Sequence, residues 1–312
     1  MEIIKNIKNN QPLEASALTI GSYDGVHFGH KKILNEVVKY SSSLNIPSVL
    51  ITFNPHPREV LGNKTSSFSL IMNLEQKLKH ISSMGIDIVY VINFTKSFSK
   101  ISPEDFLNKH VIKFFNPSCI IIGYNHHFGN KRNGSAQSLK YFCDNKSIKL
   151  KVIKPVFYKN NNVSSSIIRE HIREGKIQKA NTLLGSLFCI KAKVVSGSGR
   201  GKDLRFPTAN IKPTHQNQVL PGIGVYFVRA MIIGLNAYGM CNFGYRPTYD
   251  ENKLVMEIHF FHDGLKNLNG REIKVEFLER IRDERKFHSS EELIEQLNQD
   301  KQICLTLRAK YE

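Results

Sequence analysis

The sequence lacks the features that would assign it to a secreted or membrane-spanning class. Its 312 residues hold five cysteines, an odd number with no CxxC pair, which argues against a disulfide framework or a zinc cluster. No run of about 18 apolar residues occurs, and the opening MEIIKNIKNN has no continuous apolar segment of the secretory kind. We therefore expect a protein of the reducing cytoplasm with no membrane partner.

Acidic residues are scarce relative to basic ones. The chain has 44 Lys and Arg against 27 Asp and Glu, a formal net charge of +17. Such a charge attracts polyanions, either nucleic acids or small phosphorylated ligands. The basic residues are scattered, and no recognisable RNA- or DNA-binding motif accompanies them. The charge by itself does not choose between these partners, and scattered lysines also fit basic faces that are simply solvated. We expect no nucleic acid, and a basic nucleic-acid-binding protein remains the alternative.

The first half of the chain alternates strand and helix patterns. Short apolar runs begin at Ala17, Ser48, Ile86 and Cys119, and segments with apolar residues at helical spacing lie between them. This alternation is typical of a parallel sheet covered by helices. We predict an α/β, Rossmann-like domain over residues 1–185.

The pattern changes after Gly185. Runs such as KAKVV, VYFVRA, LVMEIHFF and EIKVEFL follow one another with Gly, Pro and Asn turns between them. A helical pattern returns only in the tail, from Ser289. We predict an antiparallel Greek-key β-barrel with a C-terminal helix over residues 186–312.

The first candidate site follows the strand that ends at Ile20. The chain continues as GSYDGVHFGH and enters a helix. A junction of this kind directs helix amides at a phosphate. His27 and His30 can face the same phosphate and donate ring N–H groups where negative charge grows in a transition state. The alternative is a turn whose histidines are structural.

The HxGH pattern resembles the signature of nucleotidyltransferases, which attack the α-phosphorus of ATP. TFNPHPREVL, IIGYNHHFGNKRNG and VSSSIIREHIREGKIQKANTLLG resemble, in order, the further motifs of the bacterial FMN adenylyltransferase module. Ser164 is expected to cap a helix on which Ser165, Ser166 and Arg169 meet the β- and γ-phosphates. Two departures from the family pattern are His126, where an aromatic residue is usual, and Ser166, where Thr is usual.

The resemblance implies a set of site residues for adenylyl transfer. The catalytic residues would be His27, His30 and Arg169, and ATP and FMN would be bound by Gly21, Tyr23, Asp24, Gly29, Asn54, His56, Asn125, Ser164, Ser165 and Ser166.

The second candidate site lies in VVSGSGRGKDLRFPTANI. Its glycines, Gly197, Gly199 and Gly201, would let backbone amides approach a phosphate, although a flexible hairpin is the alternative. Thr208 and Asn210 are two residues apart, so on an extended segment their oxygens point to one side, as a hard cation requires. We therefore predict Mg²⁺ with ATP here.

The later segments PGIGVYFV, CNFGYRPTY, LVMEIHFF and IRDERKF resemble riboflavin kinase. The resemblance implies that Glu257 is the general base toward the riboflavin hydroxyl, and that Arg246, Arg282 and Glu284 bind ATP or flavin. Arg205 departs from the family pattern, which often has Gly before FPTAN.

The two modules together resemble the bacterial bifunctional flavin enzymes, which phosphorylate riboflavin to FMN and adenylylate FMN to FAD. The implied partners are riboflavin, FMN and ATP, on a monomer or weak homo-oligomer. The alternative within this class is a chain in which His126 or Arg205 has disabled one module.

Overall fold

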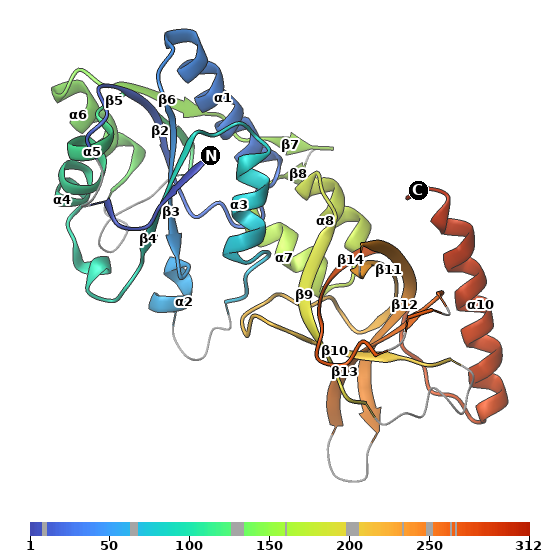
Figure 1. Cartoon of the computed structure of the whole chain (residues 1–312). Coiled ribbons are helices and arrows are strands. Elements are labelled where there is room, and N and C mark those ends of the chain that lie inside the picture. The colour runs from blue at the N-terminus through green and yellow to red at the C-terminus, as the bar shows by residue number, and fades with distance from the viewer. Residues whose placement is uncertain are drawn as a thin grey trace. The chain divides into compact units, whose positions relative to one another are not determined.

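The computed structural model describes residues 1–7, 11–62, 68–125, 134–159, 161–197, 206–232, 234–247, 252–262, 264–265 and 267–312, without the side chains of 161, 246, 247, 252 and 253. These residues divide into two compact units, Met1–Ser165 and Ser166–Glu312. The units are drawn together in Figure 1 and are described separately below.

The first unit is built on a parallel sheet of six strands, in the order β1-β4-β3-β2-β5-β6. Their bounds are β1 Glu2–Ile4, β2 Ser16–Ile20, β3 Ser48–Asn54, β4 Ile88–Asn93, β5 Pro117–Gly123 and β6 Lys149–Ile153. A short antiparallel pair, β7 (Phe157–Tyr158) and β8 (Asn161–Asn162), follows β6. The central strands are buried on both sides, which explains their continuous apolar runs.

Helices cover both faces of this sheet (Figure 1). Their bounds are α1 Phe28–Leu44, α2 Pro57–Leu61, α3 Leu74–Ser82, α4 Pro103–Phe106, α5 Lys113–Phe115 and α6 Ala136–Asn145, with a 3-10 turn at Phe98–Lys100 and a π-helical stretch at Leu107–Ile112. Local signals set their ends. Asn73 and Gln76 form a capping box at the start of α3, and Asn45 ends α1 in the left-handed conformation.

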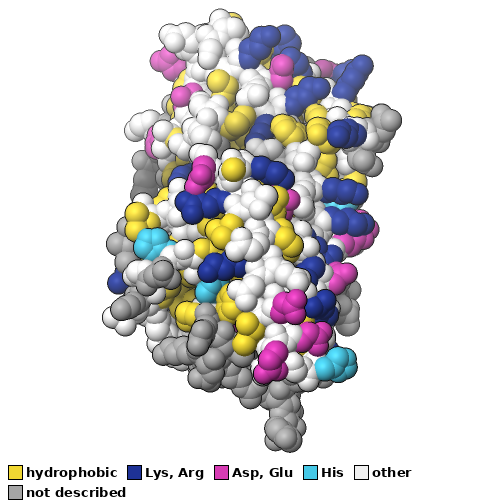
Figure 2. Space-filling model, turned by 90° about the vertical axis from the view of Figure 1, so that its right-hand side faces the viewer, with side chains coloured by type: hydrophobic (Ala, Val, Ile, Leu, Met, Phe, Trp, Pro, Cys, Tyr) yellow, Lys and Arg dark blue, Asp and Glu magenta, His cyan; other side chains and the backbone are white. Residues whose placement is uncertain are grey.

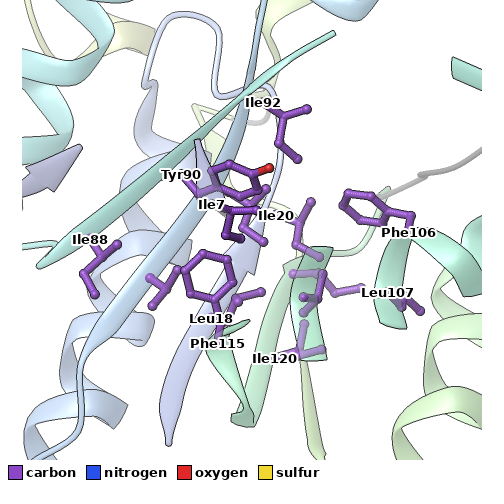
Figure 3. Packing of buried hydrophobic residues seen from close by; sticks show 14 of the residues in the cluster. Ile7, Leu18, Ile20, Ile88, Tyr90, Ile92, Phe106, Leu107, Phe115 and Ile120 are labelled. Atoms are coloured by element: carbon purple, nitrogen blue, oxygen red, sulfur yellow. The ribbon is translucent and has the colours of Figure 1, made fainter. Parts of the chain in front are cut away.

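One layer of the core lies between the sheet and the segment from α4 to α6. Figure 3 shows its close packing, in which Leu18 and Ile20 of β2 and Tyr90 of β4 meet Phe106 and Phe115. The other layer lies under α1 and α3, where Leu34 and Ile81 are fully buried. Side chains alternate between the faces along each strand, so one sheet serves both layers.

The second unit is a closed antiparallel barrel with strand order β10-β13-β12-β11-β14-β9. Its strands are β9 Phe188–Val195, β10 Ala209–Pro213, β11 Gly224–Ile232, β12 Leu235–Pro247, β13 Asn252–Phe260 and β14 Glu272–Arg282. Helix α10 (Ser290–Arg308) is capped by Ser289 and packs its Cys304 against the outside of the barrel. The predicted fold classes of both halves are confirmed.

Two helices precede the barrel, α7 (Ser165–Arg173) and α8 (Ile177–Leu184). They group with the barrel because backbone and side-chain hydrogen bonds join them to it. The Gly222 amide donates to Ile172 O at 3.0 Å, and Asn181 Nδ2 donates to Phe277 O at 2.9 Å. The compact units therefore divide at Ser165, earlier than the functional boundary predicted at residue 185.

Candidate active sites

The first candidate site gathers at the carboxyl ends of three neighbouring strands. β2 lies between β3 and β5 in the sheet, so the segments that follow these strands emerge at one edge. Gly21 follows β2, Asn54 ends β3 and Asn125 comes just after β5. This edge of an open parallel sheet is where such folds bind ligands. Sequence positions far apart are thus brought to one edge by strand order alone.

The HFGH turn forms the N-terminus of α1. His27 is the N-cap residue, and its Nδ1 accepts a hydrogen bond from the His30 amide at 3.3 Å. The two imidazole rings stack, with centroids 3.7 Å apart and planes at 17°. His27 is buried, whereas His30 is partly exposed. The predicted pair therefore sits together at a helix N-terminus, where amides and the helix dipole favour a phosphate.

Tyr23 and Asp24 hold the turn in shape. Tyr23 packs against the His30 ring, and its hydroxyl shares a 2.6 Å hydrogen bond with Thr19 Oγ1; burial raises the Tyr23 pKa, so this hydroxyl stays protonated. The buried Asp24 carboxylate accepts hydrogen bonds from the amides of Ile71 (3.0 Å) and Met72 (3.3 Å). These contacts give Asp24 a structural function beside the ligand-binding function predicted for it.

His56 has a similar structural function in the NPHP turn. It is the N-cap of α2: its Nδ1 accepts from the Arg58 amide at 3.0 Å, and its own amide donates to Glu59 Oε2 at 3.0 Å. Asn54 is exposed at the end of β3. The turn therefore presents Asn54, while His56 fixes the local backbone.

The serine motif begins beside the HFGH turn. Ser165 Oγ donates to Asp24 O at 2.9 Å, and Ser164 stands immediately before α7, the position predicted for its cap. Ser166 and Arg169 follow on α7 in the second unit, where Ser166 is exposed and Arg169 is buried.

The second candidate site is a row of polar side chains across three barrel strands. Asn210 of β10 is the register partner of Glu257 of β13, and Glu257 is in turn the partner of Asn242 of β12. Register partners in an antiparallel sheet project to the same face. Asn210, Glu257 and Asn242 therefore form a band of oxygen and nitrogen groups, with Thr208 just before β10.

A cavity of about 220 Å³ opens beside this band. Four of the predicted residues line its wall: Thr208, Glu257, Arg282 and Glu284. Its full lining is Phe206, Thr208, Val225, Met240, Asn242, Glu257, His259, Arg282, Glu284, Arg285, Phe287, Leu293, Leu297 and Asp300. The mixture of apolar walls and a few polar groups is typical of a small-molecule site.

The ends of the cavity are held by contacts that sequence reasoning missed. Arg282 makes a bidentate ion pair with Asp300 of α10, with Nη2 to Oδ2 at 2.8 Å, and Asp300 is fully buried. Gln296 Nε2 also donates to Asp300 Oδ1 at 2.7 Å. His259 shares a 3.0 Å hydrogen bond between its Nδ1 and Pro207 O, next to Thr208. The alternation of β13 signals His259, but no local pattern signals Asp300.

Close backbone approach explains one of the predicted glycines. A Cβ atom at Gly197 would lie 2.7 Å from Asn210 Cγ, so a larger residue there would displace the Asn210 side chain. Gly199, Gly201, Arg205 and His126 lie outside the described residues, as does the Arg246 side chain.

The donors at the second site suit a hard cation. Thr208 supplies a hydroxyl oxygen and Asn210 an amide oxygen, and the carboxylate of Glu257 stands in register with Asn210. Neutral and anionic oxygens are the ligands that Mg²⁺ prefers, usually together with substrate phosphates. The residues present therefore fit the predicted metal.

Other surface features are less specific. Lys and Arg side chains are spread along the face seen in Figure 2, with Asp and Glu side chains among them. Within the described part of the chain, no helix combines the length and the apolar character needed to cross a membrane.

A parallel α/β unit with a histidine turn at the edge where such sheets bind ligands, and a barrel with a cavity of apolar walls and a few polar groups, are typical of an enzyme that binds small molecules. Models of two known protein families match this chain. A sequence model of the FAD synthetase family matches residues 9–167, and one of the riboflavin kinase family matches residues 184–307. The chain belongs to the bifunctional riboflavin kinase/FMN adenylyltransferase family.

Relatives of this family match nearly end to end. The bifunctional enzyme of Buchnera aphidicola subsp. Schizaphis graminum is 38% identical, with 97% of each chain covered. That of Bacillus subtilis is 33% identical, with 93% of this chain and 92% of the relative covered. A crystal structure described as a macrolide-efflux protein from Streptococcus pneumoniae is 28% identical with a TM-score of 0.85, covering 97% of both chains. The chain is thus an enzyme of flavin cofactor synthesis, forming FMN from riboflavin and FAD from FMN.

Proposed function

We propose that the two reactions are divided between two sites, with FMN adenylylation in residues 1–185 and riboflavin phosphorylation in residues 186–312. The observation that supports this division is that the predicted site residues gather mainly at two places. Three strand ends and the HFGH turn meet at the sheet edge of the first unit, whereas Glu257, Asn210 and Asn242 share one face of the barrel.

In the barrel, Glu257 receives the proton of the riboflavin primary hydroxyl as its oxygen attacks the γ-phosphorus of ATP. A new P–O bond forms to riboflavin, the bond to ADP breaks, and ADP leaves. Arg282 and Glu284, with the apolar wall of Phe206 and Met240, hold the flavin in the cavity.

Thr208 and Asn210 would hold Mg²⁺ through their oxygens. When bound, Mg²⁺ supplies charge neutralisation at the phosphates of ATP. Gly197 leaves room for the Asn210 amide to face that position. The glycines of the preceding loop would bring backbone amides to the phosphates.

At the HFGH turn, a phosphate oxygen of FMN attacks the α-phosphorus of ATP and pyrophosphate leaves. His27 and His30 donate hydrogen bonds to the α-phosphate oxygens, where negative charge increases during transfer. Because Nδ1 of His27 accepts from the His30 amide, the neutral ring carries its proton on Nε2, which is the donor in this proposal. Gly21, Gly29, Asn54 and Asn125 complete the binding surface, and Ser164, Ser165, Ser166 and Arg169 bind the leaving phosphates.

The remaining assignments concern the setting of the enzyme. We propose a cytoplasmic monomer or weak homo-oligomer that binds riboflavin, FMN and ATP and no nucleic acid. The mixture of acidic with basic side chains on the face in Figure 2 supports the last point, because nucleic-acid binding favours a clustered basic surface.

Two variants test the division of labour. His30→Ala should lower FAD synthesis from FMN by about 100-fold or more, as loss of a transition-state donor does, and leave FMN synthesis intact. Asn210→Ala should do the reverse, with FAD synthesis measured from supplied FMN. Product chromatography after each incubation decides between these outcomes. If either variant lost both activities while folded, separate sites would be excluded.

The wild-type enzyme tests the activity of both modules. Riboflavin, ATP and Mg²⁺ should give FMN and then FAD. Accumulation of FMN alone would indicate that the adenylyltransferase module is inactive, and no product from riboflavin would indicate an inactive kinase.

A further inference from the structure

One buried cation near the first site has no part in the chemistry proposed for it. Lys77 lies on α3 and is only 6% exposed. Its Nζ donates to Ser22 O at 3.0 Å, to Thr52 Oγ1 at 3.1 Å and to Phe53 O at 3.4 Å. Three donors of an ammonium group thus meet three acceptors, which is its full capacity.

The acceptors of Lys77 come from two different segments of the site. Ser22 lies in the turn that leads to His27, whereas Thr52 and Phe53 lie near the end of β3, directly before Asn54. Thr52 Oγ1 also donates to Ser22 O at 3.3 Å. The ammonium group therefore ties the HFGH turn to the NPHP turn.

The carboxylates that face Lys77 belong to the same two segments. Asp24 and Glu59 interact with it electrostatically. Asp24 lies in the HFGH turn and accepts from the Ile71 amide, and Glu59 accepts from the His56 amide in the NPHP turn. Each turn is thus fixed locally by a carboxylate, and both carboxylates lie near one shared cation.

Packing alone does not account for a lysine at this position. Burial lowers the pKa of Lys77 to about 8, although Asp24 and Glu59 oppose the drop. The charged form is therefore less favourable in the fold than in water. Methionine is unbranched and similar in length and would fill this space without burying a charge.

We propose that Lys77 is a positioning residue for adenylyl transfer, which sets the distance between the HFGH turn and the NPHP turn. This inference rests on the assignment of FAD synthesis to the HFGH turn. The ATP phosphates and the FMN phosphate must be held in line for attack, and a displacement of about 1 Å can cost about 100-fold in rate. A single cation bonded to both segments restricts that displacement.

The test uses the full chain with Lys77→Met, Lys77→Arg and the matched control Lys79→Met. Lys79 lies on the same helix but is exposed. We expect Lys77→Met to lower kcat for FAD synthesis by about 100-fold, with KM for ATP and FMN changed only a few-fold. FMN synthesis by the same preparation should be unchanged, and Lys79→Met should behave as the wild type.

The pH profile separates positioning from simple loss of structure. FAD synthesis by the wild type should decline above about pH 8, as the Lys77 ammonium loses its proton. Lys77→Arg keeps its charge at that pH. It should therefore show more FAD synthesis than Lys77→Met, and its FAD synthesis should persist to higher pH than that of the wild type. This comparison holds even if Lys77→Met does not fold.

Three results would overturn the proposal. One is FAD synthesis within twofold of wild type in Lys77→Met, and another is identical alkaline limbs in the wild type and Lys77→Arg. The third is a loss in Lys77→Met that matches the fraction of the first unit unfolded, measured by hydrogen exchange of β2 and β3 peptides. His30→Ala tests separately whether FAD synthesis takes place at the HFGH turn. If this variant keeps FAD synthesis, that assignment is wrong, and the function proposed for Lys77 is wrong as well.

Discussion

Removing the buried charge of Lys77 should change how the stability of the first unit depends on pH. Its pKa is about 8 in the fold against an ordinary value of 10.5. This difference corresponds to about 3 kcal/mol by which the charged form is disfavoured in the native state. Since the side chain is almost wholly buried, solvent screening reduces this figure little.

The direction of the effect follows from proton binding. Between about pH 8 and pH 10.5, the unfolded chain binds more protons at Lys77 than the folded chain does, so stability rises with pH. Below about pH 8, Lys77 is charged in both the folded and the unfolded chain, so the full free-energy cost of burying its charge is present. The free energy of unfolding of the wild type, minus that of Lys77→Met, should therefore increase by about 1 kcal/mol from pH 7 to pH 9. Other groups that titrate in this range cancel in the difference.

The assay is urea unfolding followed by hydrogen exchange mass spectrometry of peptides from β2 and β3, which report on the first unit within the full chain. The Lys79→Met control should show the same pH dependence as the wild type, because Lys79 is exposed. A difference between wild type and Lys77→Met that stays flat or decreases from pH 7 to pH 9 would refute the reasoning.

Three further variants test other parts of the two sites. Gly197→Ala forces a methyl group against the Asn210 side chain, and such overpacking costs about 1–3 kcal/mol. The rate of FMN synthesis should therefore fall while the rate of FAD synthesis from FMN is unchanged, as measured by product chromatography. Unchanged FMN synthesis would contradict this. Asp300→Ala leaves the Arg282 guanidinium without its buried carboxylate. The free energy of unfolding of the barrel, measured by urea titration, should fall by about 3 kcal/mol or more, and KM for riboflavin should rise. A decrease of less than about 1 kcal/mol would argue that the ion pair contributes little to stability. Asp24→Ala removes the acceptor of a buried amide and should cost the first unit about 1–3 kcal/mol, measured by hydrogen exchange; full protection of the loop before α3 would contradict this.

The strands found from the sequence are those with continuous or alternating apolar residues. β3 and β4 are buried on both faces, and their apolar runs predicted them. β12 was not predicted because Gly239 and Gly244 and its polar residues interrupt the apolar pattern. β6 alternates lysine with apolar residues and is the last strand in the order of the described sheet. Its residues are mostly exposed or half-buried, so its apolar signal is weak.

The candidate sites likewise contain residues that local sequence motifs predicted and residues that they did not. HFGH and PTAN are local motifs, because a helix N-terminus or an extended strand places residues two or three apart on one side. The sequence by itself therefore predicted the residues at the centre of each candidate site, and its resemblance to the family predicted the two reactions. Asp300 and Lys77 could not be found this way, since their polar partners are supplied by other elements.

Only the tertiary structure decided which buried groups hold the sites in place. Lys77 donates to acceptors 55 and 24 residues away in the sequence, and Asp24 accepts from an amide 47 residues away. Such pairs form because parallel strands bring their carboxyl ends to one edge, and a buried charge or amide there must find a partner. Local patterns carry the chemistry of the reacting groups, whereas strand order and burial determine which side chains position them.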